Sequence, residues 1–519
     1  FDTELAAVKR KHQGGGWEAD GVAAAENQQL HVHLRDLLEM GKGQIFKAGA
    51  IPRQKPYFRT HNEAGRDFLT AYGNPTCSIS GDGSRMFGVW MNFHVQIIGF
   101  TTFRNFLENA LKTIHKSAKL ANVLYDVRGP IVDAAKKMED EGQKIIKLNI
   151  GNLAPFGFDA PEEIQQDMIR NLPNSAGYSD SKGIFAARKA VMHYTQQQNI
   201  AGVTLDDIYL GNGASELIVM ATSALLDNGD ELLVPSPDYP LWTAATSLSG
   251  ARPVHYLCDE DNGWMPNLAD IRAKITPRTK GLVIINPNNP TGVMYSDDML
   301  RSLVALAREF QLVILADEVY DKVLYDGVKH TAIASLSTDV LTLTFNSLSK
   351  AYRSCGYRAG WMIVSGRKAH ARDFIEGLNM LANLKLGSNV PGQYAIQTAL
   401  GGYQSIHDLV KPGGRLCRQR DLAYELITAI PGVSCVKPQA ALYMFPRLDP
   451  KIYPITDDRE FFLELLRATR VMLVQGTGFN WHQPDHFRIV FLPHEDDLRE
   501  AIGRIARFLE SYRKMHGTD

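Results

Sequence analysis

Apolar and amphipathic segments alternate along most of the chain, from about residue 115 onward. Segments with the spacing of amphipathic helices include 214–226 and 296–310, the second with Ser296 as its expected N-cap. Between the helical segments lie short runs of β-branched and other apolar residues, typical of buried strands, at 208–210, 231–235, 253–257, 281–286, 312–316, 341–345 and 360–364. This alternation predicts an α/β fold with a mostly parallel, seven-stranded sheet.

The N-terminal part does not follow this pattern. Its clearest features are an alternating segment at 91–97, typical of a half-buried strand, and a helical pattern at 103–114. His31 and His33 lack a third metal ligand, and Gly81 and Gly83 lack the strand-to-helix setting of a nucleotide-binding turn. We therefore predict no metal site and leave the structure of the extension at 1–110 open.

The composition is that of an ordinary globular protein. Apolar residues make up 45% and charged residues 22% of the 519 positions, and the net charge is -1. This balance gives no indication of a nucleic-acid partner, and no apolar run is long and uninterrupted enough to predict a membrane span. Five scattered cysteines without CxxC spacing predict neither a disulfide framework nor a zinc site, which fits the reducing cytoplasm.

The segment SLSKAYRSCGYR places Lys350 just beyond a predicted buried strand, where open α/β sheets bind their ligands. Ser347, Ser349 and Arg358 flank this lysine. Hydroxyl and guanidinium groups suit a phosphate, and the amine can form a Schiff base with an aldehyde. The segment therefore indicates a phosphorylated aldehyde, with pyridoxal phosphate as the obvious candidate. An isolated lysine of this kind usually lies on the surface without a role. The residues at the ends of the other predicted strands must therefore decide between a cofactor-binding lysine and a surface lysine.

Three further polar clusters follow predicted strands. LGNGASELIV combines a strand, a glycine turn and a helix start, which leaves backbone N–H groups for a phosphate. INPNNPTG leads from an apolar strand into a loop where Asn289 can offer its amide to a ring oxygen. ILADEVY places Asp317 after a buried strand, where a carboxylate is costly unless it pairs with a cation such as a protonated pyridine nitrogen. The alternative for Asp317 is an N-cap of the next helix.

In this order, the glycine turn, the Asn loop, the Asp-x-x-Tyr segment, the Ser-x-Ser-Lys segment and the arginine resemble the fold type I pyridoxal-phosphate enzymes, and among them the class I/II aminotransferases. YDVRGP, KLNIGN, YSDSKG, PSPDYPLWTA, SLSKAYR and QGTGFNW are similar to segments of bacterial glutamate-pyruvate (alanine) aminotransferases. The resemblance implies an N-terminal arm and part of a small domain at 111–155. It also implies a large cofactor-binding domain at 156–390 and a smaller α+β C-terminal domain at 391–519.

The resemblance also implies the roles of individual residues around the cofactor. Lys350 would bind pyridoxal phosphate as a Schiff base and then move the proton between substrate and cofactor. Asp317 would keep the pyridine nitrogen protonated, while Tyr239 would stack on the ring. Asn289 and Tyr320 would hydrogen-bond the ring hydroxyl. The phosphate would be held by Gly213, Ala214, Ser215, Ser347, Ser349 and Arg358, with Tyr178 coming from the neighbouring subunit.

On the substrate side, the resemblance implies that Arg488 in HFRIVFL binds the α-carboxylate through its forked donors. Gly151 and Asn289 would contact the same substrate, and Tyr125 would line the entrance. Arg488 also begins an otherwise apolar strand, where an unpaired arginine would be costly. Leu153 stands where close relatives commonly have proline and Ala440 where they commonly have glycine, which leaves the substrate-side geometry open.

We therefore expect a cytoplasmic, homodimeric aminotransferase of amino-acid biosynthesis, with its active site at the dimer interface. It would exchange an amino group between L-alanine and 2-oxoglutarate, giving pyruvate and L-glutamate, in a ping-pong cycle. A β-carbon-sulfur lyase and an aminotransferase with another amino donor stay open, because selectivity can depend on a single methyl group. A transcription regulator is a further alternative, although residues 1–110 lack a helix-turn-helix pattern or a basic stripe.

Overall fold

The computed structural model describes residues 114–120, 123 and 129–518. The predictions for the extension at 1–110, for His31, His33, Gly81 and Gly83, and for Tyr125 lie outside these described residues. The predicted domain boundaries at 111, 156 and 391 stay predictions.

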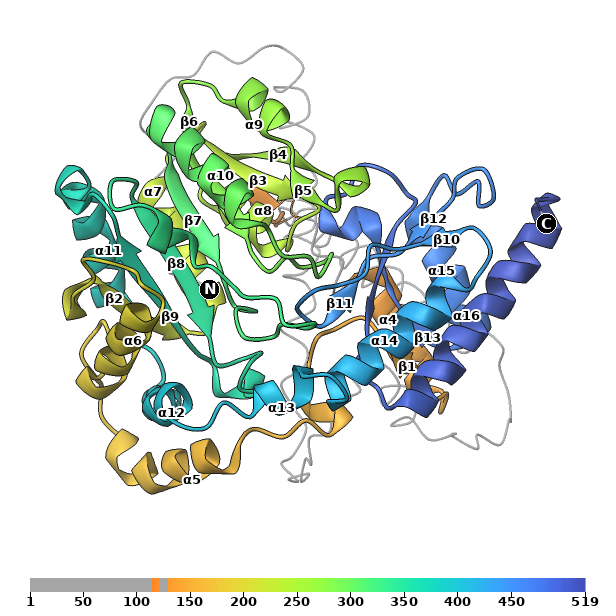
Figure 1. Ribbon diagram of the computed structural model, residues 1–519, viewed down its shortest axis with the longest axis horizontal. Coiled ribbons are helices and arrows are strands. Elements are labelled where there is room, and N and C mark those ends of the chain that lie inside the picture. The colour runs from red at the N-terminus through yellow and green to blue at the C-terminus, as the bar shows by residue number, and fades with distance from the viewer. Residues whose placement is uncertain (1–113, 121–122, 124–128, 519) are drawn as a thin grey trace, which may run out of the picture. The chain divides into compact units, whose positions relative to one another are not determined.

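All seven predicted strands form one sheet, which an eighth, short strand extends at its edge (Figure 1). The order is β2-β9-β8-β7-β6-β3-β4-β5. Strands β3, β4, β6, β7 and β8 run parallel, whereas β9 is antiparallel to both β8 and β2. Strands β2 and β8 therefore point the same way. The sheet consists of β2 (Ile208–Asn212), β3 (Glu231–Ser236), β4 (Arg252–Asp259), β5 (Met265–Pro266), β6 (Thr279–Ile285), β7 (Val313–Asp317), β8 (Thr342–Ser347) and β9 (Ala359–Ser365).

Helices cover both faces of this sheet, as the apolar runs of its strands require. Leu232 and Val234 of β3 pack in one apolar cluster with residues of α7 (Ala214–Leu225), α8 (Leu241–Leu248) and α11 (Arg372–Leu384). Leu233 points the other way, into a cluster with α9 (Leu268–Lys274) and α10 (Asp297–Glu309). Ser296 Oγ accepts a hydrogen bond from the Met299 N–H at 3.3 Å, which confirms the predicted N-cap of α10.

The C-terminal helices and short strands enclose a further core, drawn in blue and orange in Figure 1. Strand β1 (Ile146–Lys147) pairs in parallel with β13 (Val471–Met472), so the segment before residue 150 shares this core with the C-terminal part. After Lys147 the chain leaves this pairing and turns toward the cavity described below. Three other short strands form a sheet in the order β11-β15-β14.

The remaining elements complete the described chain. They are α4 (Pro130–Asp140), α5 (Glu162–Asn171), α6 (Phe185–Gln197), α12 (Val390–Gly401), α13 (Ile406–Val410), α14 (Arg415–Thr428), α15 (Asp458–Thr469), α16 (Glu495–His516), β10 (Val433–Ser434), β11 (Tyr443–Met444), β12 (Arg447–Leu448), β14 (Val474–Gln475) and β15 (Phe487–Val490). In the part of the chain that the structure describes, no helix combines the length and the apolar character needed to cross a membrane.

Candidate active site

A cavity of about 780 Å³ opens where β6, β7 and β8 end and α7 begins. This edge collects the polar residues that follow each strand, as expected for a mostly parallel sheet. Of the predicted site residues, twelve line it directly: Gly151, Ala214, Ser215, Tyr239, Asn289, Asp317, Tyr320, Ser347, Ser349, Lys350, Arg358 and Arg488. Gly213 immediately precedes Ala214 as the N-cap of α7. The structure therefore brings together clusters that lie far apart in the sequence.

Lys350 follows β8 and extends its amine into this cavity. Its Nζ donates a hydrogen bond to the carbonyl oxygen of Gly151 at 2.7 Å and lies 6.0 Å from the centre of the Tyr320 ring. Gly151 belongs to the loop after β1, so the lysine bridges the sheet edge and the segment that pairs with the C-terminal core. The amine is held by one carbonyl and remains on the cavity wall. This suits a nucleophile that must leave its hydrogen-bond acceptor to react with an aldehyde.

Asp317 ends β7 and is buried at the floor of the cavity. Trp242 Nε1 donates a hydrogen bond to its Oδ2 at 3.1 Å. Burial raises the pKa of Asp317 to about 6, against the opposing effects of the Trp242 hydrogen bond and the charge of Lys350. A carboxyl group in this setting is stabilised as a carboxylate by a further cation, so it is suited to a protonated ring nitrogen.

The N-terminus of α7 forms the opposite end of the cavity. Gly213 caps this helix without a side-chain hydrogen bond, so the first N–H groups can face an anion. Ser215, Ser347 and Ser349 add hydroxyls on the cavity wall. A Cβ atom at Gly213 would lie 2.4 Å from Nη2 of Arg358, so only glycine allows the guanidinium this close to the turn. Together these groups make a cradle for a dianionic phosphate.

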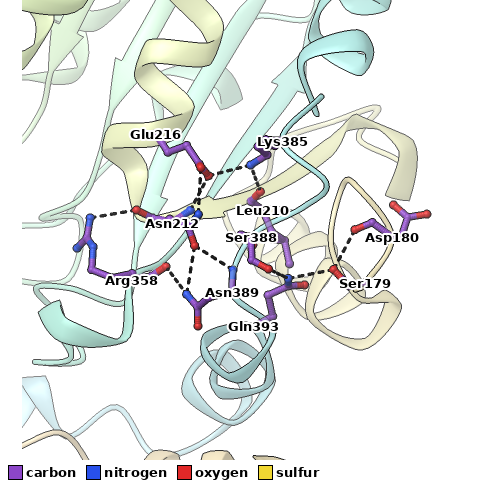
Figure 2. A network of polar contacts seen from close by, with 10 residues as sticks. All are labelled: Ser179, Asp180, Leu210, Asn212, Glu216, Arg358, Lys385, Ser388, Asn389 and Gln393. Carbon is purple, nitrogen blue, oxygen red and sulfur yellow. Dashed lines mark hydrogen bonds and ion pairs between the residues drawn. The ribbon is translucent and has the colours of Figure 1, made fainter. Parts of the chain in front are cut away.

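Arg358 is held at this cradle by backbone carbonyls. Its Nη2 donates to the carbonyl oxygen of Asn212 at 3.0 Å (Figure 2). Its Nη1 donates to the carbonyl oxygen of Cys355 at 2.9 Å. The backbone of Arg358 has φ 52° and ψ 44°, a left-handed conformation that is uncommon for a residue with a side chain. Its guanidinium still carries donors for a phosphate, because a guanidinium has five N–H groups.

Arg488 lies in β15 and lines the cavity, where it is almost fully buried. Its Nη1 donates to Oδ1 of Asn289 at 2.9 Å, and its Nη2 donates to the carbonyl oxygen of Asn149. The rings of Tyr443 and Phe479 lie 4.3 and 4.5 Å from the guanidinium carbon. The two rings and the two hydrogen bonds fix the guanidinium plane, which is the requirement for forked binding of a carboxylate.

Tyr320 and Tyr443 link the two sides of the cavity. The hydroxyl of Tyr320 donates to that of Tyr443 at 2.7 Å, and burial raises the pKa of Tyr320 well above its ordinary value, so its hydroxyl stays neutral. A Cβ atom at Gly151 would lie 2.2 Å from the Tyr443 hydroxyl oxygen. A glycine is therefore required here, because any side chain would collide with this hydroxyl.

Some predicted residues lie elsewhere, and some residues that contact site residues were not predicted. Tyr178 is 86% exposed and does not line the cavity of its own chain, and Tyr125 lies outside the described residues. The sequence reasoning missed Trp242, Tyr443 and Phe479. Trp242 and Phe479 lie within PSPDYPLWTA and QGTGFNW, but nothing in the sequence indicates that the side chain of Trp242 reaches Asp317 or that those of Tyr443 and Phe479 reach Arg488. Leu153 is fully buried beside the cavity rather than on its wall.

Comparison with known proteins shows to which family the chain belongs. Residues 143–505 match the model of the family described as aminotransferase class I and II. The chain belongs to the class I and II aminotransferases. The glutamate-pyruvate aminotransferase AlaA of Escherichia coli strain K12 is 60% identical over 405 residues, which cover 78% of this chain and 100% of the relative. The alanine aminotransferase of Mycobacterium bovis is 59% identical over 400 residues, covering 77% of this chain and 93% of the relative.

Solved structures agree with this assignment. A crystal structure of an Escherichia coli aminotransferase has a TM-score of 0.77 at 60% identity and covers 78% of this chain and 100% of its own. The alanine aminotransferase of Pyrococcus furiosus has a TM-score of 0.72 at 35% identity and covers 76% of this chain and 100% of its own. This aminotransferase is an α/β protein of fold type I, as predicted, and it depends on pyridoxal phosphate.

The residues of the cavity fit this cofactor. The α7 N-terminus, which has no side-chain cap, the serines and Arg358 can bind its phosphate. The buried Asp317 can pair with its pyridine nitrogen, and Lys350 can react with its aldehyde. When bound, the cofactor supplies an electron sink for the carbanion at the substrate α-carbon. Within the described residues, no group of three or more His, Cys, Asp and Glu side chains is placed to hold a metal ion.

Proposed function

We propose that this aminotransferase moves the amino group of L-alanine to 2-oxoglutarate, giving pyruvate and L-glutamate in a ping-pong cycle. The proposal rests above all on Arg488, which lines the same cavity as Lys350 and has its guanidinium fixed through Asn289. This arrangement suits a small 2-amino acid held by its carboxylate while its α-carbon faces the amine. The two relatives of about 60% identity with names that specify alanine or glutamate-pyruvate transfer support the choice of substrates.

Each predicted residue then has a specific task in the reaction. Arg488 binds the α-carboxylate of the amino acid, and Gly151 and Asn289 contact the same substrate. Lys350 Nζ moves the proton at the substrate α-carbon once it is released from its contact with the Gly151 carbonyl, which lies 2.7 Å away. The ionised Asp317 stabilises the protonated form of the cofactor's pyridine nitrogen.

The cofactor is held by residues from every side of the cavity. Tyr239 stacks on its ring, and Asn289 and Tyr320 hydrogen-bond its ring oxygen. The phosphate is bound by the α7 N-terminus together with hydroxyls and a guanidinium, that is by Gly213, Ala214, Ser215, Ser347, Ser349 and Arg358. The structure brings these groups to one wall, which is the support for this assignment.

A half-reaction tests the proposed substrates. The purified enzyme is mixed with L-alanine and no oxo acid, and the cofactor absorbance is followed while pyruvate is measured. We expect the absorbance to change as one pyruvate forms per active site, and 2-oxoglutarate then to restore the spectrum as glutamate appears. Continuous release of ammonia without an acceptor would show a lyase instead. A faster response to L-aspartate or L-tyrosine than to L-alanine would assign another amino donor. Lys350→Ala serves as the inactive control.

The enzyme is further proposed to be a cytoplasmic homodimer in which Tyr178 completes the site of the neighbouring subunit. Tyr178 lies on a surface with several large apolar side chains that are more than half exposed. Ser181 Oγ donates to Oδ1 of Asn383 at 2.7 Å, so the Tyr178 turn and the end of α11 belong to one surface. The exposed apolar side chains of these two segments are Tyr178, Met380, Leu384 and Leu386. Such a patch is typical of a surface that another chain covers.

Mixing two impaired variants tests this arrangement. Tyr178→Ala and Lys350→Ala each leave both sites of a homodimer defective. A mixed dimer has one intact site, formed by Lys350 of one chain and Tyr178 of the other. We expect activity to recover when the two variants are unfolded and refolded together. No recovery in a preparation shown to contain mixed dimers would contradict the shared site.

A further inference from the structure

Asn389 lies next to Arg358 and Asn212 (Figure 2) and is not one of the residues that line the cavity. Its side-chain Nδ2 donates to the carbonyl oxygens of Tyr357 at 3.1 Å and Arg358 at 3.2 Å. Its backbone N–H donates to Oδ1 of Asn212 at 2.9 Å, and the same Nδ2 lies 3.3 Å from that oxygen. Its Oδ1 accepts from the Gly392 N–H at 2.8 Å, as the N-cap of α12. One exposed side chain thus joins three segments of the chain.

The two carbonyl contacts enclose the backbone of Arg358. The carbonyl of Tyr357 belongs to the peptide unit before Arg358, and the carbonyl of Arg358 belongs to the unit after it. Both units are therefore held by the same amide of Asn389. This matters because Arg358 has a left-handed backbone with φ 52°, which a residue with a side chain keeps only when its surroundings hold it there.

Asn389 also contacts the side chain of Asn212, the residue whose backbone carbonyl accepts from the Arg358 guanidinium. Arg358 Nη2 donates to the carbonyl oxygen of Asn212 at 3.0 Å. The Asn212 side chain is held on one side by Asn389 and on the other by Glu216, whose Oε1 accepts from its Nδ2 at 3.0 Å. Lys385 Nζ in turn donates to Oε2 of Glu216 at 2.9 Å. Asn389 thus contacts both the backbone of Arg358 and the residue that the Arg358 guanidinium contacts.

Close packing leaves little room for these segments to adjust. A Cβ atom at Gly392 would lie 2.5 Å from the carbonyl oxygen of Tyr357, so the first turn of α12 lies directly against the Arg358 loop. A Cβ atom at Gly360 would lie 2.6 Å from the backbone nitrogen of Ala214, so the start of β9, directly after Arg358, also contacts the start of α7. A change in the α12 N-terminus therefore reaches the phosphate cradle through direct contacts.

We propose that Asn389 is a positioning residue for the cofactor phosphate, which acts by holding Arg358 in its left-handed conformation against the α7 turn. The proposal rests on the proposed role of Arg358 as a phosphate ligand. The competing explanation is that Asn389 serves only as the N-cap of α12. The two explanations differ in which atom matters: the Nδ2 donor holds the Arg358 loop, and the Oδ1 acceptor caps the helix.

Asn389→Asp separates these two atoms. Aspartate keeps an oxygen for the Gly392 N–H and is a good N-cap, but it presents an acceptor to three oxygens, those of Tyr357, Arg358 and Asn212. Asn389→Ser is the second variant, because serine also caps helices but is too short to reach both carbonyls. Asn267→Asp is the matched control, since Asn267 caps α9 in the same way through a 3.0 Å contact with the Asp270 N–H.

The measurement compares pyridoxal phosphate with pyridoxal, which lacks the phosphate. The full-length enzyme is stripped of cofactor, and the dissociation constant of each compound is determined by absorbance titration. We expect Asn389→Asp to weaken binding of pyridoxal phosphate by about 10-fold or more, the effect of about one lost hydrogen bond together with repulsion between acceptors. Binding of pyridoxal should change by less than about twofold, and Asn267→Asp should change neither constant.

A double variant tests whether the effect runs through Arg358. If Asn389 acts by placing this guanidinium, adding Asn389→Asp to Arg358→Ala should weaken binding of pyridoxal phosphate no further. The inference would be overturned by an additive loss of affinity in the double variant or by an equal loss of affinity for pyridoxal. Unchanged affinity for pyridoxal phosphate in Asn389→Asp and Asn389→Ser would overturn it as well. If Arg358→Ala itself binds both compounds normally, the proposed role of Arg358 fails as a separate result.

Discussion

The hydrogen bond from Trp242 to Asp317 allows the electrostatics of the site to be tested with one substitution. Trp242 is fully buried in α8 and packs edge to face on Phe345, with ring centres 5.3 Å apart. Its Nε1 donates to Oδ2 of Asp317 at 3.1 Å. Trp242→Phe keeps an aromatic ring against Phe345 but removes this donor. A second hydrogen bond to the carboxylate, from the Val319 N–H, is longer, at 3.5 Å.

The size of the effect follows from the burial of the carboxylate. Burial already raises the pKa of Asp317 to about 6, and the Trp242 hydrogen bond opposes this rise. A hydrogen bond to a charged group contributes about 1.5–3 kcal/mol, and one pKa unit corresponds to about 1.4 kcal/mol. Loss of the donor should therefore raise the pKa of Asp317 by about 1–2 units. Because only the ionised carboxylate pairs with a protonated ring nitrogen, cofactor binding should weaken as the pH falls through this pKa.

The assay is the pH dependence of the affinity of the cofactor-free enzyme for pyridoxal phosphate. We expect the acid limb of this profile to lie about 1–2 pH units higher in Trp242→Phe than in the native enzyme. Trp361→Phe is the matched control, because Trp361 is also buried and its Nε1 has no hydrogen-bond partner within the described residues. An unchanged acid limb in Trp242→Phe, or an equal shift in Trp361→Phe, would refute the reasoning.

Three further substitutions probe other parts of the site. Gly151→Ala forces the Tyr443 hydroxyl, 2.2 Å from the new Cβ atom, to move, so kcat/KM for L-alanine should fall about 10–100-fold, as expected for an overpacking cost of 1–3 kcal/mol. An unchanged kcat/KM would contradict this contact. Arg488→Lys keeps the charge but loses the fork, so KM for L-alanine should rise by about 10-fold or more, with a smaller effect on kcat. A fall in kcat alone would argue against carboxylate binding by Arg488. Lys385→Met leaves Glu216 without the cation that contacts it at 2.9 Å, so pyridoxal phosphate should bind up to about fivefold more weakly at low salt. A deficit that persists unchanged at high salt would exclude an electrostatic cause.

Much of the fold and the cavity could be predicted because both depend on local sequence patterns. The strand runs at 312–316 and 341–345 lie within one residue or two of β7 and β8, and the polar residues after them line the cavity, as expected when parallel strands end at one edge. The place of Asp317 and Lys350 at this edge of the sheet was therefore predictable from the strand pattern, although the pattern alone left their roles open. The roles of Asn289 and Arg488 required the family resemblance.

The remaining features depend on contacts between distant segments. Trp242 reaches Asp317 only because α8 packs on the same face of the sheet as α7. Tyr443 lies under Arg488 because β11 pairs with β15, and nothing in ALYMFP indicates that register. The clamp formed by Asn389 has the same origin, since its partners lie 31, 32 and 177 positions away in the sequence. A single sequence does not contain the geometry that makes such residues important.

Transfer of labelled nitrogen tests the central claim most directly. The enzyme is incubated with ¹⁵N-labelled L-alanine and 2-oxoglutarate, and the label is followed by NMR in the native enzyme and in Lys350→Ala. We predict that the label passes from alanine to glutamate with no accumulation in ammonium, and that Lys350→Ala transfers none at a measurable rate. Label in ammonium, or undiminished transfer by Lys350→Ala, would contradict an aminotransferase reaction carried by Lys350.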